Sequence, residues 1–188
     1  MKTLLLISFF FLTTVSCYAT KDPWDKDQSE WTLLMKLAYK GDTLRIDSLL
    51  THRQNVNKKN VSGWTALKVA VKNGQTKTVN YLLQHKADPN LADKEGLNSL
   101  MEACLHNNYD IATMLLQNGA NPNLTNSVGW TALMGATSFG DINIIELLLK
   151  NNADVNIKRK TDGITALALA VYNNDSQKIK LLTSYGAK

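Results

Sequence analysis

The stretch Gly63-Trp64-Thr65-Ala66-Leu67 recurs unchanged at Gly129-Trp130-Thr131-Ala132-Leu133. Midway between them lies the related Gly96-Leu97-Asn98-Ser99-Leu100, and Gly163-Ile164-Thr165-Ala166-Leu167 follows after a slightly longer step. The turn sequence Ala87-Asp88-Pro89-Asn90 keeps the same spacing, because similar turns begin at Ala120 and Ala153. Self-similarity at a fixed interval of about 33 residues predicts a repeat architecture for most of the chain.

Each repeat is expected to form two short helices, as the segment from Thr65 to Asn90 illustrates. Thr65 belongs to a residue type that caps helix N-termini, and the apolar residues after it predict a short helix. Asn73-Gly74 would end that helix, because glycine readily adopts the left-handed turn of a helix end. The Val79–Leu83 segment has apolar residues at helical spacing and predicts a second helix. One helix pair cannot bury its apolar side alone, so the pairs should stack into an all-α solenoid.

These residues resemble the signature of the ankyrin repeat family, Gly-x-Thr-Pro-Leu-His-x-Ala followed by Gly, a Leu pair and Gly-Ala-Asp-x-Asn. The resemblance covers about residues 31–188 and implies five helix-pair units joined by long β-turn loops. The units lie at about 31–60, 61–93, 94–126, 127–159 and 160–188. The first unit matches weakly, as a terminal unit should. The chain departs from the family at the Pro position, filled by Ala or Ser, and at the His position, filled by Lys68, Met101, Met134 and Ala168.

The segment before the repeats is interpreted as a targeting signal. Lys2 precedes the apolar run 4–12, which is too short for a bilayer helix but suits a signal peptide over residues 1–19. Small residues in Cys17-Tyr18-Ala19 predict cleavage before Thr20, which leaves 20–30 as a lead-in and a periplasmic or secreted protein. Alternatively, Val15-Ser16-Cys17 resembles the end of a bacterial lipobox, and a lipid on Cys17 would anchor the protein to a membrane.

Composition and spacing give no indication of catalysis, a cofactor or a metal site. The chain is 44% apolar and 20% charged with a formal net charge of +5, and its basic residues are too scattered to predict a nucleic-acid partner. Cys104 is interpreted as a buried small side chain. Glu102 and Glu146 are interpreted as isolated acids, whereas an enzyme needs a constellation of groups. The histidines lack the further ligands at local spacing that a metal needs and are interpreted as surface residues: His52, His85 and His106.

The aromatic residues indicate a protein-binding surface. Trp31, Trp64 and Trp130 share one repeat position, which Leu97 and Ile164 fill in the other units. The family resemblance implies that this position lines a concave groove, together with the last two residues of each first helix. The apolar residues at those helix ends are Tyr39, Leu105, Phe139 and Tyr172. Such a ladder offers large apolar contacts to a partner, although each Trp could instead pack on its own loop and only stabilise it.

A basic loop is the other candidate contact with a partner. Lys158-Arg159-Lys160 lies where the longer repeat step places one inserted residue, between Ile157 and Thr161. It is interpreted as a solvated loop, and contact with an acidic patch on a partner is the alternative.

The sequence therefore favours an exported, monomeric, non-catalytic protein that holds, masks or inhibits a partner protein. An effector delivered to a host cell is one alternative. An enzyme, for example in oxidative-stress defence, is another and would depend on Cys104. Fold alone does not choose among these functions.

Overall fold

The computed structural model describes residues 31–52 and 54–188. Contacts within the chain divide it into Met1–Trp31 and Thr32–Lys188, and the second unit contains all the helices described below. The predicted signal peptide, Cys17 and the lead-in 20–30 lie outside the described residues.

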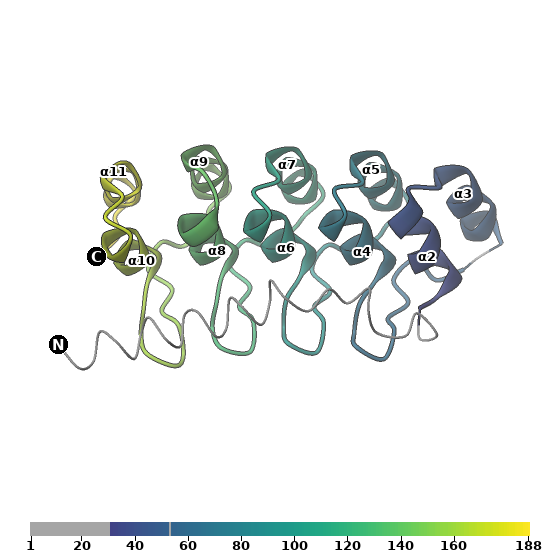
Figure 1. Cartoon of the computed structure of the whole chain (residues 1–188), viewed down its shortest axis with the longest axis horizontal. Helices are drawn as coiled ribbons and strands as arrows, with labels where there is room; N and C mark the ends of the chain where they lie inside the picture. Colours follow the sequence, from purple (N-terminus) through teal and green to yellow (C-terminus); the bar gives the residue numbers. More distant parts are fainter. Residues whose placement is uncertain (1–30, 53) are drawn as a thin grey trace. The chain divides into compact units, whose positions relative to one another are not determined.

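Ten α-helices and no strands form the described part of the chain, which confirms the all-α prediction of five stacked helix pairs. The first helix of each pair is called inner here and the second outer, and the two sets form separate rows (Figure 1). The inner helices are α2 (Leu33–Lys40), α4 (Ala66–Lys72), α6 (Ser99–Leu105), α8 (Ala132–Phe139) and α10 (Ala166–Tyr172). The outer helices are α3 (Thr43–Thr51), α5 (Thr76–Gln84), α7 (Tyr109–Gln117), α9 (Ile142–Lys150) and α11 (Ser176–Ser184).

Every inner helix begins at a side-chain cap. The Thr65 hydroxyl accepts a hydrogen bond from the backbone N–H of Lys68 at 3.2 Å, as predicted, and Asn98 does the same for Met101 at 2.9 Å. These oxygens satisfy amide groups that have no partner within the helix. After α4, Gly74 has φ +64°, the left-handed conformation expected at this helix end.

The core lies between successive inner helices and between each inner helix and its outer partner. Alanine occupies one position of four inner helices and is fully buried there, at Ala70, Ala103, Ala136 and Ala170. Because alanine has only a methyl side chain, the backbones of neighbouring units can come close together at these positions. Larger apolar residues of the outer helices, such as Leu82, Leu115 and Leu148, are also fully buried.

The long loops between units are joined to one another by hydrogen bonds. The Lys94 N–H donates to the Ser62 carbonyl at 3.1 Å, and two equivalent bonds link the following loops. An asparagine ladder adds to this: the Asn90 side-chain oxygen accepts from the Asn121 N–H at 2.8 Å, and Asn123 does so from the Asp154 N–H at 2.7 Å. The repeated asparagine therefore fixes the register between units. Within the described residues, no helix has the length and hydropathy required to cross a bilayer.

Candidate functional site

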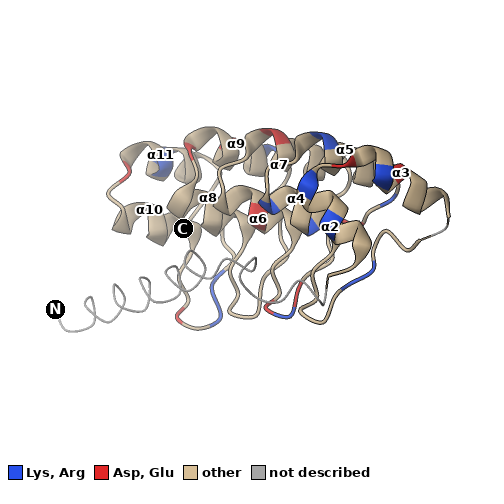
Figure 2. Cartoon of the chain, turned by 45° about the vertical axis from the view of Figure 1, so that its right-hand side comes forward, with Lys and Arg blue, Asp and Glu red and all other residues tan. Residues whose placement is uncertain are grey.

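The inner helices change in charge along the row. Lys36 and Lys40 lie on α2, Lys68 and Lys72 on α4, and Glu102 on α6, whereas α8 and α10 contain no charged residue. Figure 2 shows this change, because coloured residues occur on the inner helices only from α2 to α6. The surface formed by the C-terminal turns of these five helices together with four loop residues is called the inner-helix surface below; the loop residues are Trp64, Leu97, Trp130 and Ile164.

A buried ion pair lies between α4 and α6. The side chain of Lys68 is 1% exposed, and its Nζ lies 2.5 Å from Asp93 Oδ2 and donates to the Leu97 carbonyl at 2.9 Å. Asp93 lies in the loop before α6 and its side chain is 5% exposed. A buried ammonium is costly unless it is paired and hydrogen-bonded, and both conditions hold here.

Glu102 extends this pair into a cluster. Its side chain is 8% exposed and accepts from His106 Nε2 at 3.2 Å, while the ammonium groups of Lys68 and Lys72 each lie 3.9 Å away. Burial raises the pKa of Glu102, but the His106 hydrogen bond and the two lysines outweigh it and hold the pKa below its ordinary value. The interpretation of Glu102 as an isolated acid is wrong, because stacking brings lysines from the preceding repeat unit beside it.

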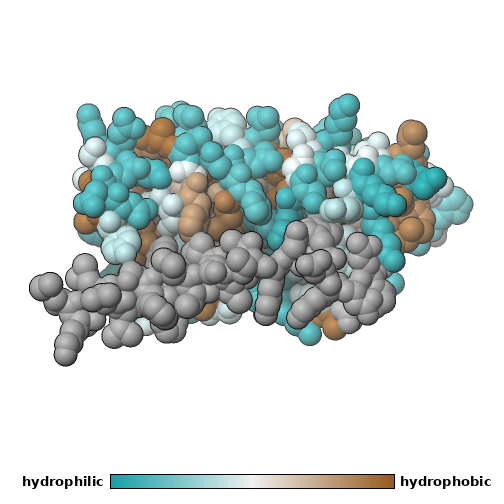
Figure 3. Space-filling model, viewed as in Figure 1, coloured by the Kyte–Doolittle hydropathy of each residue, from teal (hydrophilic) through white to brown (hydrophobic). Residues whose placement is uncertain are grey.

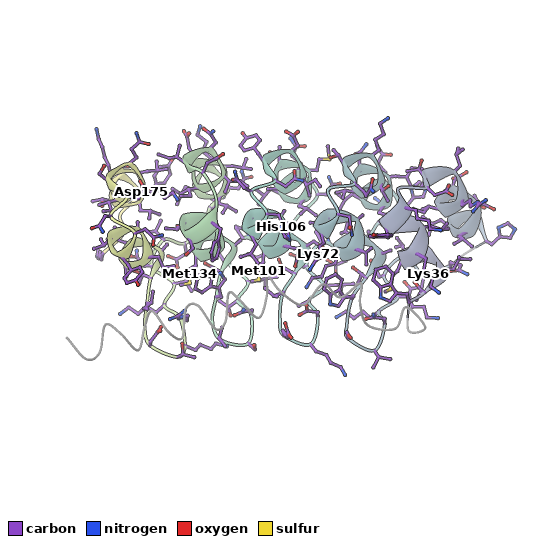
Figure 4. The ribbon with its side chains drawn as sticks, viewed as in Figure 1. Lys36, Lys72, Met101, His106, Met134 and Asp175 are labelled. Atoms are coloured by element: carbon purple, nitrogen blue, oxygen red, sulfur yellow. The ribbon has the colours of Figure 1, made fainter. Side chains whose placement is uncertain are left out.

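Trp64 covers the lysines of this cluster. Lys68 Nζ lies 4.8 Å from the centre of its indole ring and Lys72 Nζ lies 5.4 Å away, which is cation–π geometry. Lys72 and His106 come from neighbouring inner helices and lie close together (Figure 4). Trp64 is half-buried, so it packs on the cluster and still presents part of its ring to solvent.

Trp130 packs differently, over a helix that has a glycine. A Cβ atom placed on Gly135 would lie 3.4 Å from Trp130 Nε1 and 3.5 Å from Leu105 Cδ2. The indole and Leu105 therefore leave room above α8 for a methyl group but occupy the space that a longer side chain would need. The Arg159 guanidinium lies 5.5 Å from the Trp130 ring centre, and Arg159 itself pairs with Asp162. In the basic loop, Lys158 and Lys160 are exposed and Arg159 is not.

The residues of the predicted apolar ladder differ in their exposure. Leu97 is only 5% exposed, so it offers little surface to a partner. On the face seen in Figure 3, brown apolar patches alternate with teal hydrophilic residues. Three aromatic residues at the ends of inner helices stay exposed: Tyr39 (38%), Phe139 (40%) and Tyr172 (46%). The remaining ladder residues, Trp31, Leu105 and Ile164, are half-buried.

Cys104 is buried and the three histidines lie at the surface, as expected. Cys104 is fully buried, and burial raises the pKa of its thiol to about 12. His52, His85 and His106 are exposed. Across residues 31–52 and 54–188, no group of three His, Cys, Asp or Glu side chains could hold a metal ion. A pocket of about 310 Å³ lies on the outer helices α7 and α9 and is lined by Tyr109, Asn143, Glu146, Leu147 and Lys150.

Comparison with known families agrees with the stacked helix pairs. The family model for ankyrin repeats, described as three copies, matches residues 5–93, 34–126 and 100–188. The chain belongs to the ankyrin repeat family. No curated protein matches it. Ankyrin repeats are generally protein–protein interaction modules, and members of the family are typically non-catalytic.

Sequence reasoning missed the charged cluster of this ankyrin protein. Lys68 stands where other units have Met35, Met101 and Met134, and Asp93 stands where other units have Asn60 and Asn126. Two departures of opposite charge within one unit, Lys68 at the Met position and Asp93 at the Asn position, are the signal that could have revealed the contact.

Proposed function

We propose that this ankyrin protein is an exported, non-catalytic module that holds, masks or inhibits a partner protein through its inner-helix surface. The partner's apolar side chains would pack against the aromatic residues at the ends of α2, α8 and α10. Export rests on the signal-peptide pattern of residues 1–19 and gives a periplasmic or secreted protein.

The observation that carries the proposal is the exposure of aromatic side chains on this surface. Tyr39, Phe139 and Tyr172 lie 38–46% exposed, although their rings gain free energy when they are removed from water. Aromatic residues are common among the few contacts that supply most of the binding energy at protein interfaces. A partner that covers these rings would use them as anchors.

The thiol enzyme, which was the catalytic alternative, loses support. A thiol nucleophile must be reachable and must ionise near neutral pH. Cys104 is fully buried and its pKa is raised to about 12, so it meets neither condition.

The test is affinity capture with a matched control. Mature protein (20–188) carrying Phe139→Ser and Tyr172→Ser is compared with protein carrying Tyr109→Ser and Tyr185→Ser, whose rings are 46% and 44% exposed on and beside outer helices. A partner captured from the native envelope fraction should be lost with the first pair and kept with the second. Equal capture by both variants would contradict binding at the inner-helix surface.

Trp64 and Trp130 are poor first targets for this experiment. Trp64 covers Lys68 and Lys72, and Trp130 packs over Gly135, so replacing either ring changes packing as well as any contact. The exposed rings separate binding from stability more cleanly.

A further inference from the structure

We infer that the partner presents an extended segment with acidic side chains over α2 and α4 and large apolar side chains over α8 and α10. This inference rests on the proposed function and specifies the chemistry of the partner. It follows from the uneven charge of the inner-helix surface.

The cations at the α2–α4 end exceed the carboxylates that neutralise them. Four lysines lie on these two helices, and the two carboxylates that pair with them, Asp93 and Glu102, leave a surplus of two positive charges. Lys68 is matched by Asp93 within the fold. Lys36 and Lys40 form no ion pair with any residue that the structure describes, and Lys40 is exposed while Lys36 is half-buried.

Repeat register places these two lysines on the same surface as the cluster. Lys36 occupies the position on α2 that Glu102 occupies on α6, and Lys40 occupies the position of His106. Lys36, Lys72 and His106 are labelled along the inner helices in Figure 4. A carboxylate arriving there would find ammonium groups, and its attraction would also speed association.

The α8–α10 end offers the opposite chemistry. Both helices lack charge, and they end in Phe139 and Tyr172, which are 40% and 46% exposed. The Lys178 ammonium reaches the C-terminus of α8, but its side chain is 13% exposed and it already donates to the Thr137 and Gly140 carbonyls and pairs with Asp175. Apolar side chains of a partner would gain contact area on these helices. One segment that crosses the five inner helices covers four steps of about 10 Å each, which an extended chain of about 12 residues can span.

A protein segment fits this surface better than a nucleic acid. Phosphate recognition needs cations along the whole contact, and here the third inner helix contributes Glu102 and the last two contribute no charge. Nucleic-acid binding is therefore treated as an outcome that would overturn the inference.

The probe is a fluorescein-labelled peptide, slightly longer than this span, with glutamates in one half and Phe and Leu in the other. A second peptide has Lys in place of Glu, and a third has Ser in place of Phe and Leu. Fluorescence anisotropy is measured on the mature chain and on Lys36→Glu/Lys40→Glu. The matched control, Lys77→Glu/Lys180→Glu, makes the same charge change at exposed sites on α5 and α11. Lys36→Gln/Lys40→Gln provides a milder variant if the reversal disturbs folding.

The expected result is that the mature chain prefers the acidic–apolar peptide to both altered peptides. Lys36→Glu/Lys40→Glu should bind it at least about tenfold more weakly and gain affinity for the Lys-containing peptide, while the control stays near wild type. Raising the salt should weaken the wild-type interaction.

Three outcomes would overturn the inference: equal binding of acidic and Lys-containing peptides, equal loss in the control, or tighter binding of a single-stranded oligonucleotide of the same length. If a captured partner depends on Phe139 and Tyr172 but not on Lys36 and Lys40, the proposed function stands and this inference fails. If it depends on neither pair, both fail.

Discussion

The junction between α4 and α6 and the junction between α6 and α8 have the same arrangement of helices and loops but are filled by side chains of different chemistry. Lys68 and Asp93 meet at the first, and Met101 and Asn126 hold the equivalent positions at the second. Both Lys68 and Met101 are 1% exposed. A buried cation therefore occupies a place that the next unit fills with a thioether.

The loops explain how either chemistry is accommodated. Asp93 Oδ1 accepts from the N–H groups of Glu95 and Leu97, both at 2.9 Å. Asn126 Oδ1 does the same for Val128 at 3.1 Å and Trp130 at 2.8 Å. In both residues only Oδ1 holds the loop, so the second terminal atom of the side chain can be an oxygen, as in Asp93, or a nitrogen, as in Asn126. In Asp93 this second atom is Oδ2, which pairs with the Lys68 ammonium. The geometry of the loop and the charge of the junction are therefore set by different atoms.

The largest expected effect comes from breaking the charged junction. Lys68→Met introduces the residue found at Met101 but leaves Asp93 buried without its cation and removes one of the two lysines beside Glu102, so it should lower the free energy of unfolding by about 3–5 kcal/mol. Urea unfolding measures this. Lys68→Met/Asp93→Asn copies the second junction and should recover most of the loss. If the single and double variants are equally stable, the two junctions do not differ as described.

Leu148→Ala measures how much the free energy of unfolding falls when only apolar packing is removed. Leu148 is fully buried in α9, and removing its side chain should cost about 2–5 kcal/mol. Lys150→Ala on the same helix should stay within about 0.5 kcal/mol, because its ion pair with Glu146 is exposed. Comparing the urea midpoints of both variants with that of Lys68→Met shows whether loss of the buried ion pair or loss of apolar packing lowers stability more. Small effects at both sites would show that the register of α9 is wrong.

Acidification should weaken the charged junction selectively. The pKa of Glu102 is lower in the folded chain than its ordinary value of 4.5, so its stabilising contribution is complete above that pH. The contribution is lost as the pH falls through the folded pKa. Glu102→Gln should be less stable than wild type by about 1–3 kcal/mol at pH 7. The gap should narrow as the pH falls below 4.5, as followed by urea unfolding at each pH. A gap that is constant with pH would contradict an ionised Glu102.

The smallest expected effect is a gain at the uncharged junction. Gly135→Ala places a methyl group in ordinary contact with Trp130 and Leu105, at 3.4 and 3.5 Å. Because glycine disfavours a helix interior, thermal unfolding should show stabilisation of about 0.5–1 kcal/mol. A loss of stability would mean that Trp130 must move to make room for the methyl group.

Much of the fold could be predicted from the sequence, whereas less of the candidate site could. Thr65 and Gly74 were placed correctly, because caps and turns act within a few residues. The ladder residues were chosen by repeat position, which alone does not reveal burial. Leu97 shares the position of Trp64 and Trp130 but is 5% exposed.

The sequence by itself therefore determined the repeat length, the helix pairs and the family, since these depend on signals inside each unit of about 33 residues. Only the tertiary structure decided which charged residues meet. Lys68 and Glu102 are far apart in the sequence and belong to different units. Their distance depends on how closely and at what rotation the units stack, and that is set by the shapes of many packed side chains together. Local spacing carries no measure of that geometry.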